Sequence, residues 1–315
     1  MKQTHKLKLP NKINDIYTIG KLLGRGGFGM VYDVSHKRYP MQPLAAKIER
    51  TRKINGKQNK HPQLYYEYRM YKHLHKRLQT GHNFLPRVKM FTQIFTEDKV
   101  KLNVMVMDKV GANVAKIFSS HNKSFTISGV MSIGIQMVNC IKAIHKCNVI
   151  HRDVKPENFC VGWGDQQDRL FIVDFGLSKC FRNSDGTHIP YRSGKSLTGT
   201  PRYASIHCHQ GVEQSRRDDM ESIIYVLIYL ACGKLPWQNL RRKKRPQKNS
   251  GAQTTAAENI DLILKKKMDI SPEVLCKDMH KNMCICLKYI QTIDFDEAPN
   301  YEKIRNLLIG CAIIP

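Results

Sequence analysis

The sequence lacks any long run of apolar residues. A membrane-spanning helix requires roughly 18 such residues, whereas the longest candidate, Ile223–Cys232, is about half that length and follows a cluster of acidic side chains. The first residues, Met1–Lys6, contain no apolar signal core. We therefore expect no membrane span and a cytoplasmic or nuclear location.

Acidic residues are scarce. The chain carries 26 Asp and Glu against 52 Lys and Arg, which gives a formal charge of +26. Such an excess attracts polyanions, namely acidic or phosphorylated proteins, nucleic acid or an anionic membrane surface. The densest basic run, 241–248, precedes a polar stretch and predicts an exposed loop. Nucleic-acid binding there is an alternative, but no interleaved aromatic residues support base stacking, so we do not expect it as the main role.

Paired zinc-ligand spacings are also absent. Cys284 and Cys286 lack the two-residue spacer of a zinc motif, and His207-Cys208-His209 has no second ligand pair. All ten cysteines lie between Cys140 and Cys311, mostly within apolar helical patterns. We expect reduced thiols in a core rather than disulfides.

The 315 residues suit two lobes, and we detect no internal repeat. Apolar alternation predicts a small β-rich part, with one helix starting after Pro62. The pattern turns helical after Gly111, with an apolar stripe from Val130 to Ile144. We therefore expect an α+β, bilobal fold with lobes at 1–108 and 109–315. The predicted strands are 16–23, 30–34, 44–48, 87–95 and 102–107, and further helices are expected at 219–232 and 302–309.

A glycine-rich segment, Gly24–Gly29, lies between the first two predicted strands. Such motifs also occur in dinucleotide-binding units, where a helix follows. Here the strand-like Met30–Val34 follows, which favours a loop folding over nucleotide phosphates. Lys47 lies on the next apolar strand, where a buried ammonium needs a partner. We expect Glu67 to be that partner; the alternative is two independent surface charges.

The most informative segment is His151–Asn158. Asp153 can orient or deprotonate a hydroxyl, Lys155 can neutralise a phosphoryl group, and Asn158 can hold Mg²⁺ through its amide oxygen. Asp174 follows an apolar strand-like run and offers a second metal ligand. This order and spacing indicate phosphoryl transfer. The alternative is an ordinary polar turn, but its apolar flanks argue for a site.

Together these residues resemble a eukaryotic protein kinase over about 17–308. The usual Ala-Pro-Glu is missing, and Leu197–His207 and Glu213–Ser222 stand in its place. These segments are very similar to the casein kinase 1 family, of which the chain resembles a divergent member. Tau-tubulin and vaccinia-related kinases match less well. Further similar segments are His61–Leu64, Asn103–Met107, His188–Arg192 and Leu235–Gln238.

The resemblance implies a non-specific serine/threonine protein kinase that uses ATP and Mg²⁺. It implies Asp153 as the catalytic base and Lys155 as its phosphate-bridging partner. It also implies that Thr200 lies beside Asp153 and that Asn158 and Asp174 are the magnesium ligands. The residues implied for ATP are Leu23, Gly24, Gly26, Gly29, Val31, the Lys47–Glu67 pair, the gatekeeper Met107 and the hinge residues Asp108 and Val110.

The resemblance also implies acidic or already phosphorylated protein substrates, bound through Arg202, Lys195 and Lys248. A lysine at position 155 implies Ser or Thr as the acceptor. Pro201, Asn239 and Ile224 depart from the family pattern, as do apparent insertions at 54–59 and 249–258.

Two further expectations concern the larger lobe and the activity. We expect Arg216 and Arg217 to pair with nearby acids, namely Glu213, Asp218 and Asp219. We also expect a monomer. A catalytically weak scaffold is the alternative to an active kinase, and its signature would be a lost Lys47, Asp153 or Asp174. All three are present.

Overall fold

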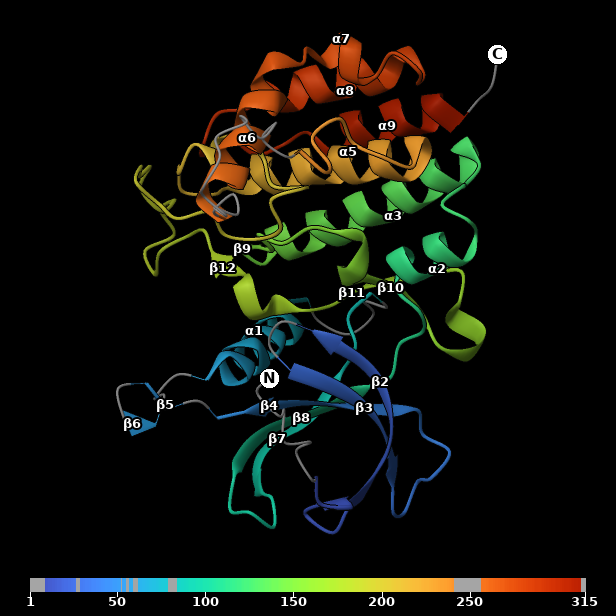
Figure 1. The fold of residues 1–315 in the computed structure, drawn as a ribbon, viewed down its shortest axis with the longest axis vertical. Coiled ribbons are helices and arrows are strands. Elements are labelled where there is room, and N and C mark those ends of the chain that lie inside the picture. Colours follow the sequence, from blue (N-terminus) through green and yellow to red (C-terminus); the bar gives the residue numbers. More distant parts are fainter. Residues whose placement is uncertain are drawn as a thin grey trace, which may run out of the picture. The chain divides into compact units, whose positions relative to one another are not determined.

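The computed structural model describes residues 9–26, 29–51, 53–54, 57–58, 62–78, 84–240 and 256–312. The chain forms two compact units, one rich in strands and one mainly helical (Figure 1). The first unit comprises the residues up to Gly111 together with 161–176. The second comprises 112–160 and the residues from Leu177 onward. This is the α+β composition that the sequence predicts.

The first unit contains an antiparallel six-stranded sheet with the order β1-β2-β3-β4-β8-β7. The predicted strands are confirmed, although β2 and β3 extend into the glycine-rich motif because Gly26 pairs with Gly29. A short ribbon of β5 and β6 lies where an insertion was expected. The bounds are β1 (Lys12–Ile13), β2 (Tyr17–Gly26), β3 (Gly29–His36), β4 (Leu44–Arg50), β5 (Lys53–Ile54), β6 (Lys57–Gln58), β7 (Val88–Phe95) and β8 (Lys101–Asp108).

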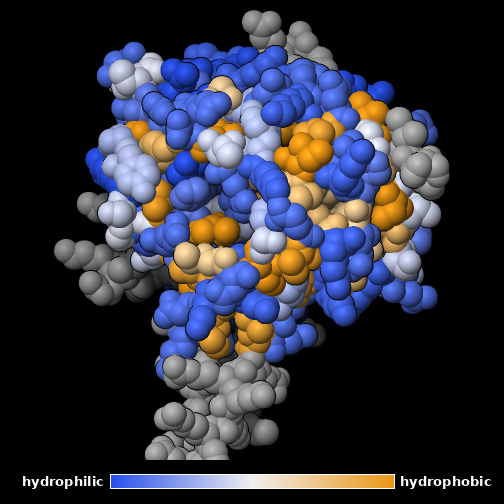
Figure 2. Space-filling model, turned by 90° about the horizontal axis from the view of Figure 1, so that it is seen from above, coloured by the Kyte–Doolittle hydropathy of each residue, from blue (hydrophilic) through white to orange (hydrophobic). Residues whose placement is uncertain are grey.

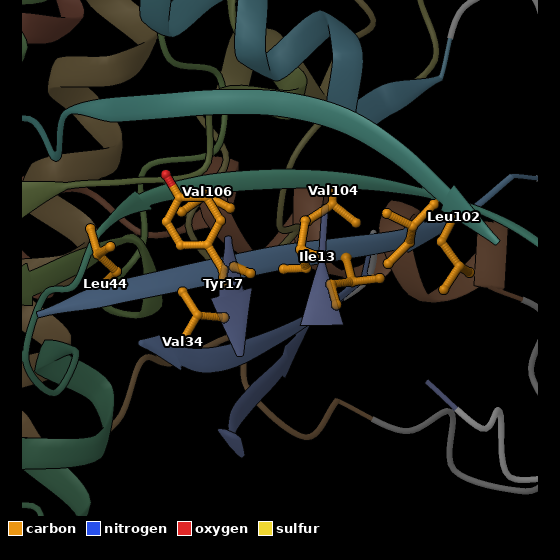
Figure 3. Packing of buried hydrophobic residues seen from close by; sticks show 10 residues of the cluster. Ile13, Tyr17, Val34, Leu44, Leu102, Val104 and Val106 are labelled. Atoms are coloured by element: carbon orange, nitrogen blue, oxygen red, sulfur yellow. The ribbon is translucent and has the colours of Figure 1, made fainter. Parts of the chain in front are cut away.

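One face of this sheet carries the hydrophobic core of the first unit. Leu44, Ala46 and Ile48 alternate along β4 and are almost fully buried in a cluster with Val104 and Val106 of β8 (Figure 3). Because side chains alternate across a strand, Ala45 and Lys47 point to the opposite face. The strand therefore presents Lys47 on the face away from this cluster.

The second unit is built around a central helix that packs against two others. Helix α3 (Ile127–Lys146) contacts both α5 (Arg216–Cys232) and α9 (Tyr301–Ala312). The predicted helices are thus confirmed, with longer ends. The remaining helices are α2 (Val114–Ser120), α4 (Ile206–His209), α6 (Ala256–Asp269), α7 (Pro272–Leu275) and α8 (Lys281–Gln291).

Short elements carry the loops of interest. Strands β9 (Val149–Ile150) and β12 (Lys179–Cys180) pair antiparallel. In the sequence they flank residues 161–176, which belong to the first unit. The other short elements are β10 (Phe159–Val161), β11 (Leu170–Ile172) and the 3₁₀ turns η1 (Pro156–Asn158), η2 (Gly164–Gln166) and η3 (Phe175–Leu177). Segment 151–158 begins directly after β9, and only Val173 separates segment 174–176 from the end of β11.

Within the described part of the chain, α3 alone is long and apolar enough to cross a membrane by length and composition. The sequence interpretation, which considered uninterrupted apolar runs, overlooked it. Its apolar residues Val130, Met137, Ile141 and Ile144 are completely buried. Since α3 also contacts α5 and α9, it has the character of a core helix.

All ten cysteines lie in the described part of the chain, none of them is joined in a disulfide there, and most are buried. Burial raises the pKa of Cys140 and of Cys160 to about 12, so both are neutral thiols at physiological pH. These two residues serve as small apolar side chains of the core.

The surface shown in Figure 2 is mostly hydrophilic, with small, separate hydrophobic patches. This is the face seen from above in Figure 1, on the side of α7 and α8. Such a distribution agrees with the high proportion of lysine and arginine in the sequence.

Candidate active site

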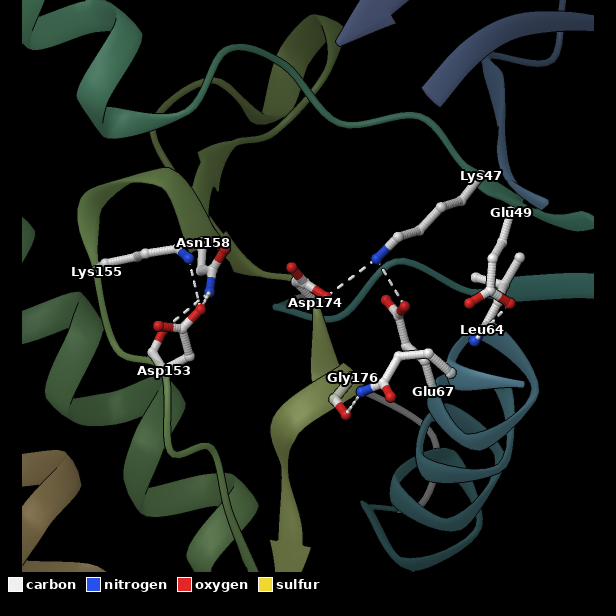
Figure 4. Close-up of polar contacts among 10 residues, drawn as sticks. Lys47, Glu49, Leu64, Glu67, Asp153, Lys155, Asn158, Asp174 and Gly176 are labelled. Carbon is white, nitrogen blue, oxygen red and sulfur yellow. Dashed lines mark hydrogen bonds and ion pairs between the residues drawn. The ribbon is translucent and has the colours of Figure 1, made fainter. Parts of the chain in front are cut away.

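In the first unit, Lys47 makes a buried ion-pair network (Figure 4). Its Nζ lies 2.6 Å from a carboxylate oxygen of Glu67 and 3.0 Å from one of Asp174. The Glu67 side chain is 2% exposed and that of Lys47 is 12% exposed. Burial acts to lower the pKa of Lys47, but the two carboxylates raise it above its ordinary value. Lys47 therefore stays charged, and the alternative of two independent surface charges is wrong.

Helix α1 (Gln63–Leu78) positions Glu67 because this glutamate lies within the buried stripe of the helix. Leu64, Tyr71 and Leu74 recur at helical spacing around it and are buried. One carboxylate oxygen of Glu49 on β4 accepts the Leu64 amide at 3.2 Å. A carboxylate at a helix N-terminus is favourable, so β4 supplies both Lys47 and an anchor for α1.

The same helix holds the segment that follows β11. The Gln63 side-chain amide donates to the Gly176 carbonyl, and the Tyr71 ring packs edge-on against Phe175 at 5.0 Å. Asp174 itself has φ +67°, a conformation that residues other than glycine rarely adopt. Such strain persists where surrounding contacts enforce it, and here it turns the carboxylate toward Lys47.

The glycine-rich motif lies beside Lys47 in the sheet register. Gly24 pairs with Val31, Val31 with Lys47, and Lys47 with Met105, so one row crosses four strands. A Cβ on Gly29 would lie 2.5 Å from the Ile48 carbonyl oxygen, which explains glycine at this position. Leu23 is 37% exposed, and Gly27 and Phe28 lie outside the described residues.

The predicted gatekeeper and hinge lie at the end of β8, whose last residue is Asp108. Met107 is 8% exposed and pairs with Ala45 across the sheet. The Asp108 amide donates to the Arg87 carbonyl at 2.9 Å, and its carboxylate pairs with Lys89 at 2.7 Å. The Asp108 amide is therefore already engaged within the first unit.

In the second unit, a buried aspartate on α5 fixes the start of the loop 151–158. One oxygen of Asp219 accepts the His151 amide at 2.7 Å, and the other accepts the Arg152 amide at 2.9 Å. His145 Nε2 donates to Asp219 at 2.9 Å. Burial acts to raise the pKa of Asp219, but these hydrogen bonds lower it below its ordinary value. The sequence interpretation missed this anchoring role.

Both carboxylate oxygens of Asp153 accept hydrogen bonds, one of them from residues of this same loop (Figure 4). Lys155 Nζ lies 2.5 Å from one, and the Thr200 hydroxyl donates to the other at 2.7 Å. The Asn158 amide nitrogen donates to the Asp153 carbonyl at 2.8 Å. Lys155 also reaches the Thr200 hydroxyl at 3.3 Å. The structure thus brings together these four predicted residues, and Asp153 is not part of an ordinary exposed turn.

Gly199 allows Thr200 to approach Asp153. Its φ is +102°, and an added Cβ would lie 2.4 Å from the Arg152 carbonyl oxygen. No side chain fits that gap without moving the main chain on one side. The close passage of segment 198–200 across the loop therefore depends on glycine.

Lys195 is the predicted anion-binding residue that lies in a cavity, of about 240 Å³. Arg152 and Lys179 also line this cavity, and sequence reasoning missed both. Glu213 balances part of the charge, lying 3.0 Å from Lys179 and 3.5 Å from Lys195. The cavity therefore combines three cations with a single paired acid along its lining.

The other two predicted anion residues are not in this cavity. The Arg202 guanidinium carbon lies 5.6 Å from the centre of the Tyr229 ring and 5.7 Å from that of Tyr203, which is cation–π geometry. Lys248 lies outside the described residues, as does the basic run 241–248.

The expected pairing of Arg216 and Arg217 with nearby acids is wrong. Arg216 donates to the Asp296 carbonyl, and Arg217 donates to the Ile293 carbonyl at 2.9 Å. Their guanidinium groups lie over Phe181 and Phe295. Planar guanidinium groups favour such contacts, and the acids of this region are engaged by other donors.

Asp174 of the first unit and Asn158 of the second unit each carry a side-chain oxygen of the type that Mg²⁺ prefers. The Asp174 carboxylate is 27% exposed and accepts Lys47 through one oxygen. The Asn158 contacts to Asp153 use its amide nitrogen, so they leave its amide oxygen for other partners. Hard oxygen donors of this kind fit Mg²⁺, which takes its other ligands from water and phosphate.

Comparison with models of known protein families finds a match to the protein kinase domain over residues 17–292. This range contains Lys47, Glu67, Asp153, Lys155, Asn158, Asp174 and Thr200. It begins at the first residue of β2 and ends one residue after α8.

Proposed function

Because the chain belongs to the protein kinase family, we propose that it is an ATP- and magnesium-dependent serine/threonine kinase of the casein kinase 1 type. Its substrates are acidic or phosphorylated proteins. The observation that carries the proposal is the contact of Asp153 with both Lys155 and Thr200. A lysine two residues after the base accompanies Ser and Thr as acceptors in the family that the sequence resembles.

In the proposed roles, the residues of the first unit bind the nucleotide. Lys47, held by Glu67, contacts the α and β phosphates, and the glycine-rich strands cover them. Met107 borders the adenine pocket, where the Asp108 carbonyl and the main chain of Val110 recognise the base. Asp174 and Asn158 hold Mg²⁺, which supplies neutralisation of phosphate charge when bound.

The residues of the second unit prepare the hydroxyl. Asp153 accepts the proton of the attacking Ser or Thr hydroxyl, and Lys155 faces the charge that develops on the transferred phosphoryl group. Thr200 holds one Asp153 oxygen at 2.7 Å, which fixes the direction of the carboxylate. The amides bound by Asp219 keep this loop in place.

Two sets of cations support the proposed preference for acidic substrates. Arg152, Lys179 and Lys195 line one cavity, and Arg202 is held at the rings of Tyr203 and Tyr229. Guanidinium and ammonium groups form charge-assisted hydrogen bonds with carboxylates and phosphates. The casein kinase 1 assignment rests on the segment Thr200–Asp219 and on the absence of Ala-Pro-Glu.

A peptide screen tests the proposal. Peptides with Ser, Thr or Tyr as the only acceptor, each in an acidic and a neutral version, are incubated with labelled ATP and Mg²⁺. We expect phosphate on Ser and Thr, faster in the acidic versions. Phosphate mainly on Tyr, or equal rates for both versions, would contradict the serine/threonine or the acidic part of the proposal respectively.

The Gly199→Ala substitution tests how the Asp153 contacts arise. The added Cβ meets the Arg152 carbonyl, so either segment 198–200 or the loop 151–158 must shift, and in both cases we expect the Thr200–Asp153 contact to lengthen. Since small misplacements of catalytic groups are costly, we expect kcat/KM to fall about 100-fold. Steady-state kinetics with an acidic serine peptide measure it.

Gly194→Ala is the matched control. Gly194 also has a positive φ, +74°, but nothing lies within 4 Å of its added Cβ. Both substitutions carry a backbone penalty of about 1–2 kcal/mol, which thermal unfolding reports, and only Gly199→Ala adds the clash. Equal losses of activity in the two variants would mean that the close passage at Gly199 does not matter.

A further inference from the structure

Three main-chain carbonyls around Arg202 are bound by side chains from other elements of the second unit. The Trp237 indole nitrogen donates to the Arg202 carbonyl at 2.7 Å. His209 Nε2 donates to the Pro201 carbonyl at 2.9 Å. Lys267 on α6 donates to the Pro201 carbonyl at 3.1 Å and also to the Ala204 carbonyl. Lys267 thus bridges the two carbonyls on either side of Arg202.

Lys267 is an unusual lysine because it is 3% exposed. Its Nζ lies 4.8 Å from the centre of the Tyr225 ring and 5.0 Å from that of Trp237. The preceding Lys265 and Lys266 are exposed. A buried ammonium is costly unless its donors are satisfied, and here two carbonyls and two aromatic faces surround it. The third lysine of this run therefore has a different role from the first two.

The buried environment of Lys267 contains few opposing charges. Burial lowers the pKa of Lys267 to about 7, against the attraction of Glu221 and Cys208. Glu221 accepts the Tyr225 hydroxyl at 2.6 Å and the Ile206 amide at 3.0 Å. A neutral amine keeps two N–H groups, so both carbonyl contacts persist in either protonation state of Lys267.

We propose that Lys267 is a positioning residue for substrate selection, which fixes the main chain of 201–204 and so presents Arg202 to an acidic side chain of the substrate. This inference rests on the proposed function. Arg202 is held by its carbonyl through Trp237 and by its guanidinium group against Tyr203 and Tyr229. Without Lys267, the buried Ala204 loses its carbonyl donor, and the segment that carries Arg202 loosens.

Lys267→Met tests the role, with Lys266→Met as the control on the same helix. Methionine keeps the approximate length of the side chain but leaves the Ala204 carbonyl without its Lys267 donor, so thermal unfolding of both variants is measured alongside. We expect Lys267→Met to lower the acidic-over-neutral ratio of kcat/KM about tenfold, the usual scale for a lost hydrogen bond to a charged group. In Lys267→Met we expect KM for the acidic peptide to rise, while kcat for that peptide and KM for ATP stay unchanged. Lys266→Met retains the wild-type ratio.

Two results would overturn the role: an unchanged ratio in Lys267→Met, or an equal loss of kcat on both peptides. A second readout does not need activity. The Tyr203 and Ala204 amides donate to the Thr200 carbonyl at 2.9 and 3.0 Å, and their hydrogen exchange should be about tenfold faster in Lys267→Met alone. If the wild type showed no acidic preference, the proposed function would fail, and the exchange rates would still decide whether Lys267 holds the segment.

Discussion

Asp174→Ala is expected to lower kcat by about 1,000-fold or more, because a magnesium ligand contributes several kcal/mol to transition-state stabilisation. The fold should survive. Lys47 keeps Glu67 at 2.6 Å, and Asp174 is 27% exposed, so its removal leaves no buried unpaired charge. Phosphate incorporation into an acidic serine peptide measures the loss.

The Asp174 variant should also lose magnesium-dependent nucleotide binding. In the wild type, Mg²⁺ with ATP should raise the unfolding temperature, since a ligand that binds only the folded state stabilises it. In Asp174→Ala this rise should be much smaller, while unfolding without ligand stays close to wild type.

Asp165→Ala is the control. Asp165 is an exposed acid in 161–176, the same segment of the first unit that contains Asp174. It should behave like the wild type in both measurements. Incorporation by Asp174→Ala at the wild-type rate would show that Asp174 holds no essential metal.

The fold was predictable where the pattern is local. Alternation along 44–48 marks β4, and the helical recurrence of Leu64, Tyr71 and Leu74 marks α1. The Lys47–Glu67 pair was also predictable, because a lysine on an apolar strand needs an acid and Glu67 lies one turn into the next helix. Both inferences use residues that are close in the chain or share one buried face.

The hydrogen bonds that anchor the segments around the site were not predictable from the sequence, because they join residues that are far apart in the chain. Asp219 binds amides 67 and 68 positions earlier, and nothing in the sequence distinguishes it from the neighbouring Asp218. Arg216 and Arg217 were expected to pair with acids nearby, yet they donate to carbonyls at 296 and 293. A charge in a sequence indicates the need for a partner but does not identify it.

Lys267 is a further residue whose role the sequence does not reveal. Three consecutive lysines, 265–267, look alike in the sequence, and a charge run normally lies on a solvated face. Only the helix phase decides that the third points inward, toward the Pro201 and Ala204 carbonyls. The burial of Lys267 could therefore be predicted only from knowledge of where α6 packs.

Asp153→Asn should lower kcat by about 1,000-fold, since general bases contribute about 10²–10⁴ in rate. Asparagine keeps the size of the side chain and one acceptor oxygen, so the Lys155 or the Thr200 contact can persist. The amide cannot take the hydroxyl proton. Lys155 loses its ion pair, but its side chain is 22% exposed and can be solvated, so thermal unfolding should change little.

This variant should differ from Asp174→Ala in its nucleotide binding. Asp153 has no proposed contact with ATP or Mg²⁺, so the magnesium-dependent rise in unfolding temperature should persist in Asp153→Asn while turnover is lost. Asp278→Asn, at an exposed position of the same unit, should be normal in both measurements. A kcat of Asp153→Asn within tenfold of the wild-type value would mean that Asp153 only orients the hydroxyl, since a loose transition state needs little proton transfer. Retained nucleotide binding together with lost turnover would assign Asp153 to the chemical step and leave metal binding to Asp174 and Asn158.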